Sequence, residues 1–238
     1  MSNKIFKLHL LNLNYSSWSL RARIAVEHCN IPCEIITYYK EDPQSYATYK
    51  ALSPTGLLPL LEINSESGSL LIGESLAILE TFAESTPSMW PTDPLDRAHA
   101  RFVAAEMHGG FLALRKAMSM DWGRRIAPGK ITWSPDVQSE IQRIFDVWRA
   151  CRDRTVSGAG AGADEGYLYG SFTIADAMYV PVVLRFQTYG VEPRDAVIAD
   201  YMQTVLNTPA MRKLAALAEE ERKSHVFPWP EYNLYSDV

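Results

Sequence analysis

Two neighbouring serines, Ser16 and Ser17, stand where a hydroxyl group can do chemistry. They follow the turn-forming Asn14 and precede a segment in which Leu20 and Ile24 share one face of a predicted helix. A serine at this position can cap the helix by accepting a backbone N–H. It can also donate its own proton to a bound anion, such as a thiolate, which the N-terminus of the helix stabilises as well. The residues alone leave both uses open.

A second polar pair, Glu74 and Ser75, follows Gly73 and begins a helix predicted over 75–84. A carboxylate at this position can hold an α-ammonium group. A hydroxyl and the free N–H groups of a first helical turn can hold an α-carboxylate. The pair is therefore suited to a zwitterion. The other interpretation is structural, because Glu and Ser are common in the first turns of helices.

Pro59 interrupts a run that otherwise has the pattern of a strand, LLPLLEI at 57–63. Proline has no N–H to donate to a neighbouring strand and is normally excluded from the interior of a sheet. Either Pro59 begins an edge strand, or the Leu58–Pro59 peptide bond is cis and turns the backbone.

Other kinds of site find little support. The chain has three cysteines, an odd number that makes a poor disulfide framework. The C-x-x-x-C spacing of Cys29 and Cys33 is that of neither a redox dithiol nor a zinc knuckle. The five histidines show no metal-ligand spacing, and the glycine motifs of nucleotide-binding loops are missing. We therefore expect no metal site.

Charge and hydropathy argue against two classes of partner. The net charge is −5 and no basic run is longer than Arg124-Arg125, so we expect no nucleic-acid binding. No window approaches 18 uncharged apolar residues, so we expect no membrane span. The N-terminal segment does not have the pattern of a secretory signal peptide, which favours a cytoplasmic location.

The elements that must position these residues alternate between strands and helices up to residue 85. Strand patterns fall at 5–12, 33–39, 57–63 and 69–72, and helical patterns follow Ser16 and cover 43–52 and 75–84. This order predicts an α/β sheet with helices on its faces. Its first two strands should be parallel, and its last two should form a hairpin.

Composition changes after residue 85. Residues 86–94 are rich in proline and predict a linker. Beyond it we expect an all-α region with helices over 95–120, 135–155, 173–189, 195–206 and 209–222, and a flexible loop at 157–166. Apolar residues lie on more than one side of 95–120, which predicts burial on several sides; they include Phe102, Val103, Met107, Phe111, Leu112 and Leu114.

Four runs, taken together and in this order, resemble cytosolic glutathione transferases: NYSSWSLRARIA, SPTGLLPLLE, IGESLAILETFAE and GSFTIADAMYVP. The resemblance covers essentially the whole chain, and its N-terminal run is most similar to the serine-type classes, especially zeta-like and bacterial members. It implies a thioredoxin-like glutathione-binding domain at 1–85 and a helical domain at 95–238 that forms the second-substrate pocket.

The resemblance implies roles for single residues near the N-terminus. Ser16 matches the catalytic serine, and Ser17 and Trp18 line the same turn. Leu58 matches the residue whose backbone pairs with the cysteinyl part of glutathione, and Pro59 matches a cis-proline.

Both ends of the tripeptide have implied partners. Glu74 and Ser75 match an acidic-Ser pair that holds the γ-glutamyl end. Many zeta and tau members place a lysine near the glycine carboxylate, but here the matching residues are 55–57, Thr-Gly-Leu. Lys40 and Lys50 are both candidates to replace it.

Two features of the helical region remain. Thr173 and Asp176 match a capping box at the start of its central helix, which is a structural role. Four tryptophans either belong to the core or line an apolar second-substrate pocket: Trp90, Trp122, Trp133 and Trp148.

The resemblance implies a homodimeric enzyme that uses glutathione as co-substrate and conjugates its thiolate to small apolar electrophiles. One alternative is a glutathione-dependent cis-trans isomerase, which adds the thiolate reversibly. Another is a non-catalytic protein that binds glutathione or hydrophobic ligands, since a fold does not fix a function. No cysteine lies in the turn of Ser16, which argues against thiol-transferase chemistry.

Overall fold

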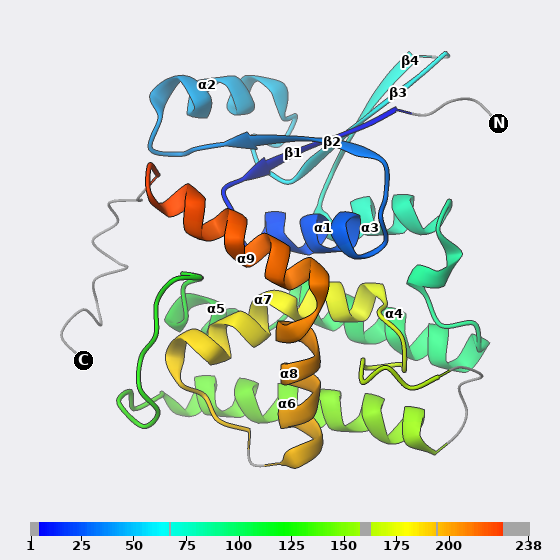
Figure 1. Ribbon diagram of the computed structural model, residues 1–238, viewed down its shortest axis with the longest axis vertical. Coiled ribbons are helices and arrows are strands. Elements are labelled where there is room, and N and C mark those ends of the chain that lie inside the picture. The colour runs from blue at the N-terminus through cyan, green and yellow to red at the C-terminus, as the bar shows by residue number, and fades with distance from the viewer. Residues whose placement is uncertain (1–4, 67, 158–162, 194, 226–238) are drawn as a thin grey trace.

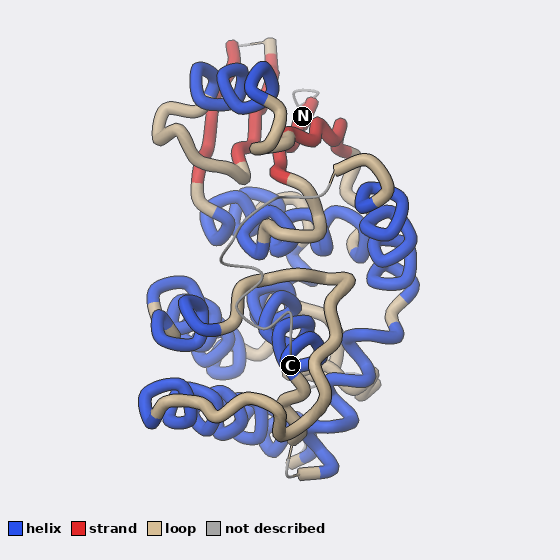
Figure 2. Tube along the Cα trace, turned by 90° about the vertical axis from the view of Figure 1, so that its left-hand side faces the viewer, coloured by secondary structure: helices blue, strands red, loops and turns tan. Residues whose placement is uncertain are grey.

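The computed structural model describes residues 5–66, 68–157, 163–193 and 195–225 (Figure 1). A four-stranded sheet lies at one end of the molecule, and helices fill the rest (Figure 2). Half of the loop predicted at 157–166 lies outside the described residues, because 158–162 are not among them.

The sheet has the predicted connectivity. Its strands are β1 (Ile5–Leu11), β2 (Cys33–Tyr38), β3 (Leu60–Ser65) and β4 (Gly68–Gly73), in the order β2-β1-β3-β4. β1 pairs with β2 in parallel and with β3 antiparallel, and β3 and β4 form the hairpin. The expected parallel crossover and hairpin are therefore confirmed.

Helices cover both faces of this sheet. α1 (Ser17–His28) and α3 (Ser75–Ala83) lie on one side, and α2 (Pro43–Leu52) lies on the other (Figure 1). Alternate residues of β1 face opposite sides, so Leu8 and Leu10 are buried with α1 and α3.

Local signals explain where two of these elements begin. The Asp42 carboxylate accepts the backbone N–H groups of Gln44 and Ser45, and Pro43 fits the first position of a helix, so α2 begins as predicted. The Leu58–Pro59 bond is cis, and β3 begins only at Leu60. Of the two alternatives for Pro59, the cis bond is therefore the one observed.

The helical region begins after the short η1 (Pro87–Met89). Its helices are α4 (Pro94–Gly109), α5 (Leu112–Ala117), α6 (Pro135–Val156), α7 (Ile174–Tyr189), α8 (Ala196–Asn207) and α9 (Pro209–Arg222). α7 is the centre of this region, since every position except Gln187 is buried. None of the helices within the described residues is long and apolar enough to cross a membrane.

A single apolar core joins the sheet to the helices. One hydrophobic cluster extends from Phe6 in β1 to Ala218 in α9, and α1 packs on both α3 and α7. The domain boundaries expected from the sequence, 1–85 and 95–238 with a linker at 86–94, stay a prediction.

The helix predicted over 95–120 is wrong in one respect: it is broken. α4 ends at Gly109, and α5 follows Phe111, whose φ is 60°. A Cβ on Gly110 would lie 2.8 Å from the Glu106 carbonyl oxygen, so the chain needs glycine where it leaves α4. Within one chain the segment also keeps an exposed apolar side, because Phe102 is 54% exposed and Leu112 is 69% exposed.

The capping box at the start of α7 is confirmed. Thr173 is the N-cap, and the buried Asp176 carboxylate accepts its backbone N–H at 2.8 Å and its hydroxyl at 2.9 Å. The other carboxylate oxygen accepts the Leu168 N–H at 3.0 Å. Burial raises the pKa of Asp176 to about 6, although the hydrogen bonds favour the ionised form.

Replacing Asp176 by alanine should lower the free energy of unfolding by about 1–3 kcal/mol, because buried donors lose their acceptor. For a chain of this length, the melting temperature should fall by about 2–4 °C per kcal/mol. Calorimetry or circular dichroism measures the change, with the exposed Asp200→Ala as the control. Equal melting temperatures for the two variants would contradict the structural role.

Candidate active site

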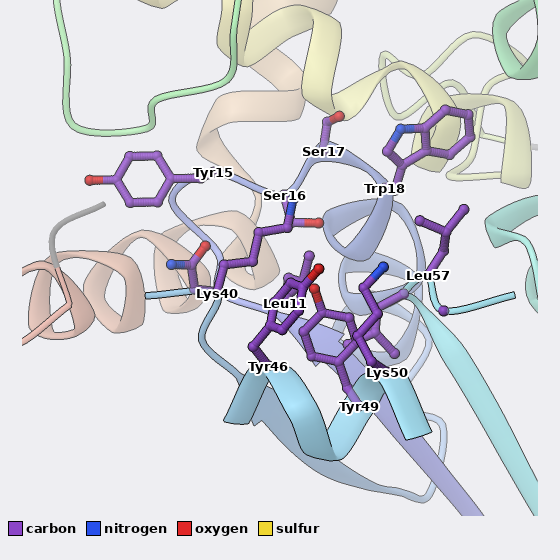
Figure 3. Close-up of a pocket in the computed structure, with 13 residues that line it drawn as sticks. Leu11, Tyr15, Ser16, Ser17, Trp18, Lys40, Tyr46, Tyr49, Lys50 and Leu57 are labelled. Atoms are coloured by element: carbon purple, nitrogen blue, oxygen red, sulfur yellow. The ribbon is translucent and has the colours of Figure 1, made fainter. Parts of the chain in front are cut away.

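A cavity of 480 Å³ opens beside the first turn of α1 (Figure 3). The loop before β3 contributes Gly56, Leu57 and Leu58 to its wall. Its other lining residues come from the end of β1, the turn after it, and α2 with the loop before it: Leu11, Asn12, Tyr15, Ser16, Ser17, Trp18, Lys40, Tyr46, Tyr49 and Lys50. Four of the predicted site residues, Ser16, Ser17, Trp18 and Leu58, therefore meet at one cavity.

Ser16 is the N-cap of α1. Its hydroxyl oxygen accepts the backbone N–H of Ser19 at 3.3 Å, and it donates to the Ser19 hydroxyl at 3.0 Å. The Ser19 oxygen also accepts the N–H of Leu11 at 2.9 Å. The capping use of Ser16 is thus confirmed. Because Ser16 also lines the cavity, a rotation of its hydroxyl can direct the proton toward a bound anion.

Ser17 makes a different contact. Its oxygen accepts a hydrogen bond of 3.1 Å from the buried Arg185 in α7, and Arg185 also donates to the Met118 carbonyl at 2.7 Å. In Figure 3 the Ser17 hydroxyl points away from Lys50, whereas the Ser16 side chain lies nearer to it. Ser17 therefore ties the first turn of α1 to the helical region.

Three guanidinium groups gather around this turn. Arg21 and Arg115 lie 4.4 and 4.8 Å from the ring centre of Trp18, an attractive arrangement for a cation and an aromatic face. Arg21 is 1% exposed, and burial lowers its pKa, as do Arg115 and Arg185. Positive charge is therefore concentrated where α1 begins, which favours an anion there.

Glu74 and Ser75 begin α3 as predicted, but they do not line the 480 Å³ cavity. Glu74 has φ 64° and a half-exposed side chain, and its carboxylate lies 3.5 Å from His108 Nε2. Ser75 is fully buried, and its hydroxyl has no hydrogen-bond partner among the described residues. Burial and the nearby Arg21 lower the pKa of His108.

Both candidate lysines line the cavity. Lys50 Nζ lies 5.5 and 5.8 Å from the rings of Tyr46 and Tyr49. Burial lowers the pKa of Lys40, and the charge of Lys50 lowers it further. Gly56, at φ +66°, leaves room for Lys50, whose side chain would be 3.3 Å from a Cβ at that position. The wall of the cavity formed by α2 and the loop before it therefore carries two cationic side chains.

Cysteine and metal chemistry do not fit this site. None of the three cysteines lines the cavity, and burial raises the pKa of Cys29 and of Cys33 to about 11. A thiol with such a pKa is a poor nucleophile at neutral pH. Within the described part of the chain, no group of His, Cys, Asp and Glu could hold a metal ion.

The four tryptophans belong to the walls of the core rather than to this cavity. Trp148 is fully buried against Tyr179 and Tyr201, and Trp90 and Trp122 are buried as well. Trp133 is partly buried and contacts Tyr189. None of them lines the 480 Å³ cavity.

Sequence reasoning missed Arg185, Arg115 and His108, because each reaches the site from a distant part of the chain. One signal was available for Arg185. It is a lone charge within the apolar run VPVVLRF, and a buried arginine is rare unless polar groups meet it.

Residues 15–85 match the family model "Glutathione S-transferase, N-terminal domain". This segment of the chain is therefore similar to the N-terminal domain of glutathione S-transferases. A probable glutathione S-transferase of Coccidioides immitis is 26% identical over 196 residues, which cover 74% of this chain and 78% of that protein. The serine-type subclass stays a prediction.

Two other relatives carry the name maleylacetoacetate isomerase. A probable maleylacetoacetate isomerase of Caenorhabditis elegans is 32% identical over 101 residues, and that of Rattus norvegicus is 34% identical over 105 residues. Each alignment covers 42% of this chain. The chain matches about half the length of these two relatives, 45% and 47%.

Solved structures share the fold of the whole chain. The maleylacetoacetate isomerase from Anaeromyxobacter dehalogenans, with GSH bound in its active site, has a TM-score of 0.60 at 20% identity and covers 90% of this chain and 96% of its own. Glutathione transferase Omega 2S from Trametes versicolor has a TM-score of 0.63 at 19% identity, with coverages of 93% and 97%. The thioredoxin-like fold followed by a helical region is therefore confirmed.

Proposed function

We propose that the chain is a glutathione transferase that binds glutathione in the 480 Å³ cavity and holds its sulfur as a thiolate at the first turn of α1. The observation that carries this proposal is the position of Ser16. Its hydroxyl stands at the N-terminus of a helix and on the wall of the cavity, in the turn around which the guanidinium groups of Arg21, Arg115 and Arg185 gather.

These features all favour the ionised sulfur. A free thiol has a pKa of about 8.5, so lowering it by two units stabilises the thiolate by about 2.7 kcal/mol. A hydroxyl donor, a helix N-terminus and nearby cations each lower the pKa of a thiol. The ionised sulfur then attacks a small apolar electrophile, which the protein holds beside it.

The cavity also suits the rest of a tripeptide. The backbone of Leu58, next to the cis-Pro59, can pair with the cysteinyl part. Outside that cavity, at the start of α3, the hydroxyl of Ser75 and the carboxylate of Glu74 suit the carboxylate and ammonium groups of the γ-glutamyl end. Lys40 and Lys50 then face the glycyl carboxylate from the wall that α2 and the loop before it form.

A second candidate function is glutathione-dependent cis-trans isomerisation. Two relatives above 30% identity are named maleylacetoacetate isomerases, which favours it. The same thiolate would add reversibly to a double bond, so the proposed residue roles are unchanged. Turnover assays with an electrophilic halide and with a cis-enone distinguish the two reactions. Glutathione binding without turnover of either substrate would favour a non-catalytic binding protein.

Assembly and location are proposals as well. We propose a homodimer, because α4 exposes Leu95 (74%) and Phe102 (54%) in addition to its buried face. The three cysteines form no disulfide, which suits a reducing compartment such as the cytoplasm. We also propose a role in detoxification, which requires that the electrophilic substrate be a toxic compound.

Ser16→Ala should reduce conjugation of a chloronitrobenzene by about 10–1000-fold, because the thiolate loses a donor. The pKa of bound glutathione should rise, so the acid limb of the kcat/KM profile should move to higher pH. Loss of the cap should also cost about 1 kcal/mol of stability, which thermal unfolding measures separately. Ser17→Ala is the matched variant: if it shows the pH shift and Ser16→Ala does not, the choice of serine is wrong.

Ser75→Ala and Glu74→Gln should raise the KM for glutathione more than they lower kcat. Contacts with the γ-glutamyl end are the same in the ground and transition states, so their loss weakens binding. Steady-state kinetics and titration calorimetry measure both effects, and Glu84→Gln, exposed beyond the other end of α3, serves as control. Unchanged affinity in both variants would remove these residues from the site.

Sedimentation at micromolar concentration should show a species of twice the chain mass of 26.8 kDa. The physical reason is the apolar surface of α4, which a two-fold contact would cover on both subunits at once. A species of one chain mass would refute the dimer, and with it any contribution of a second subunit to the cavity.

A further inference from the structure

The turn between β1 and α1 is held by a carboxylate from the opposite end of the chain. Glu221, in the last turn of α9, accepts the backbone N–H of Leu13 through one oxygen and that of Asn14 through the other, both at 3.2 Å. The Asn14 side chain donates to the second oxygen at 2.8 Å and to the Ala218 carbonyl at 2.8 Å. Ser16 follows two residues later.

Within the described residues, the hydrogen bonds of the Glu221 carboxylate all go to Leu13 and Asn14. No lysine or arginine of this part of the chain lies within 4.0 Å of it. Burial raises the pKa of Glu221, while its hydrogen bonds to the turn and the nearby His225 lower it. Tyr39 is the other titratable group that interacts with this carboxylate. Within the described residues, the hydrogen bonds of the Glu221 carboxylate therefore serve the turn alone.

Other contacts fix the same turn from the helical side. The Asn14 carbonyl accepts the N–H of Trp122 at 3.2 Å, and Asn14 itself is fully buried. Next to Trp122, Asp121 lies 3.6 Å from the Arg222 guanidinium of α9. α9 runs beside α1 (Figure 1), so it is well placed to act on the start of that helix.

The turn between β1 and α1 is weakly stabilised by its own hydrogen bonds. Its internal backbone hydrogen bond, from the Ser16 N–H to the Asn12 carbonyl, is long at 3.3 Å. The N–H groups of Leu13 and Asn14 point outward to Glu221 instead. A buried N–H needs an acceptor, so the location of this carboxylate decides where the backbone before Ser16 lies.

We propose that Glu221 is a positioning residue for the reaction: its ionised carboxylate sets the place of the turn, and hence the alignment of the Ser16 hydroxyl and the α1 N-terminus with the glutathione sulfur. This inference rests on the proposed function. A displacement of about 1 Å in a reacting group can cost about 100-fold in rate.

The test is Glu221→Gln, which keeps the shape of the side chain but replaces one carboxylate oxygen by an N–H₂ group. One of the two backbone N–H groups, of Leu13 or of Asn14, then faces a donor instead of an acceptor. We expect kcat/KM to fall about 10–100-fold through kcat, with the KM for glutathione unchanged because α3 is untouched. The acid limb of the pH profile should move to higher pH, and the thiolate absorbance of bound glutathione should decrease. Glu220→Gln, exposed on the same helix, is the control and should match the wild type.

A merely structural role would lower the melting temperature and leave the pH profile and kcat per folded molecule unchanged, and that result would overturn the proposal. If Glu221→Gln does not fold, Glu221→Asp keeps the charge but draws the carboxylate back by one C–C bond, about 1.5 Å. It should show the same pH shift, and a profile equal to that of Glu220→Gln would also overturn the proposal. Calorimetry of the wild type with glutathione comes first, because absence of binding there refutes the proposed function instead.

Discussion

The packing of α1 against α7 is the contact on which the site depends. α1 carries Leu20 and Ile24 into the shared core, and α7 is buried at nearly every position. Because α7 cannot move without opening that core, it provides a rigid surface for the first turn of α1. The hydrogen bond from Arg185 to Ser17 then fixes the rotation of that turn. The geometry of the proposed site thus depends on apolar packing and is adjusted by a few polar contacts.

The cost of this arrangement is electrostatic. Arg115 and Arg185 lower the pKa of Arg21, and burial of a guanidinium is unfavourable unless it is compensated. The aromatic face of Trp18 and the carbonyl groups at the ends of α4 and α5 offset part of that cost. An anion at the start of α1 would offset more, so the charge distribution that destabilises the free protein is the one that favours an ionised ligand.

Local chemistry made the sheet region predictable from the sequence. Asp42 and Pro43 define the start of α2, and the strand pattern broken at Pro59 marks the cis bond, because each signal lies within a few residues of its effect. The break between α4 and α5 was missed, since two glycines inside an apolar pattern were outweighed by the periodicity around them. Contacts such as Glu221 with Asn14 join residues 207 positions apart, and no local pattern encodes them.

The continuous core has a consequence for how the two halves unfold. Because the cluster from Phe6 to Ala218 is shared, a chain cut after residue 85 would leave the α7-facing side of α1 in water. We therefore expect the thioredoxin-like half to be less stable when it is cut from the helical half. A substitution deep in α7 should likewise lower the free energy of local unfolding at the turn of Ser16, although it removes no contact of that turn. Residues that do not contact a substrate can in this way change the fraction of molecules in which the turn before Ser16 is folded.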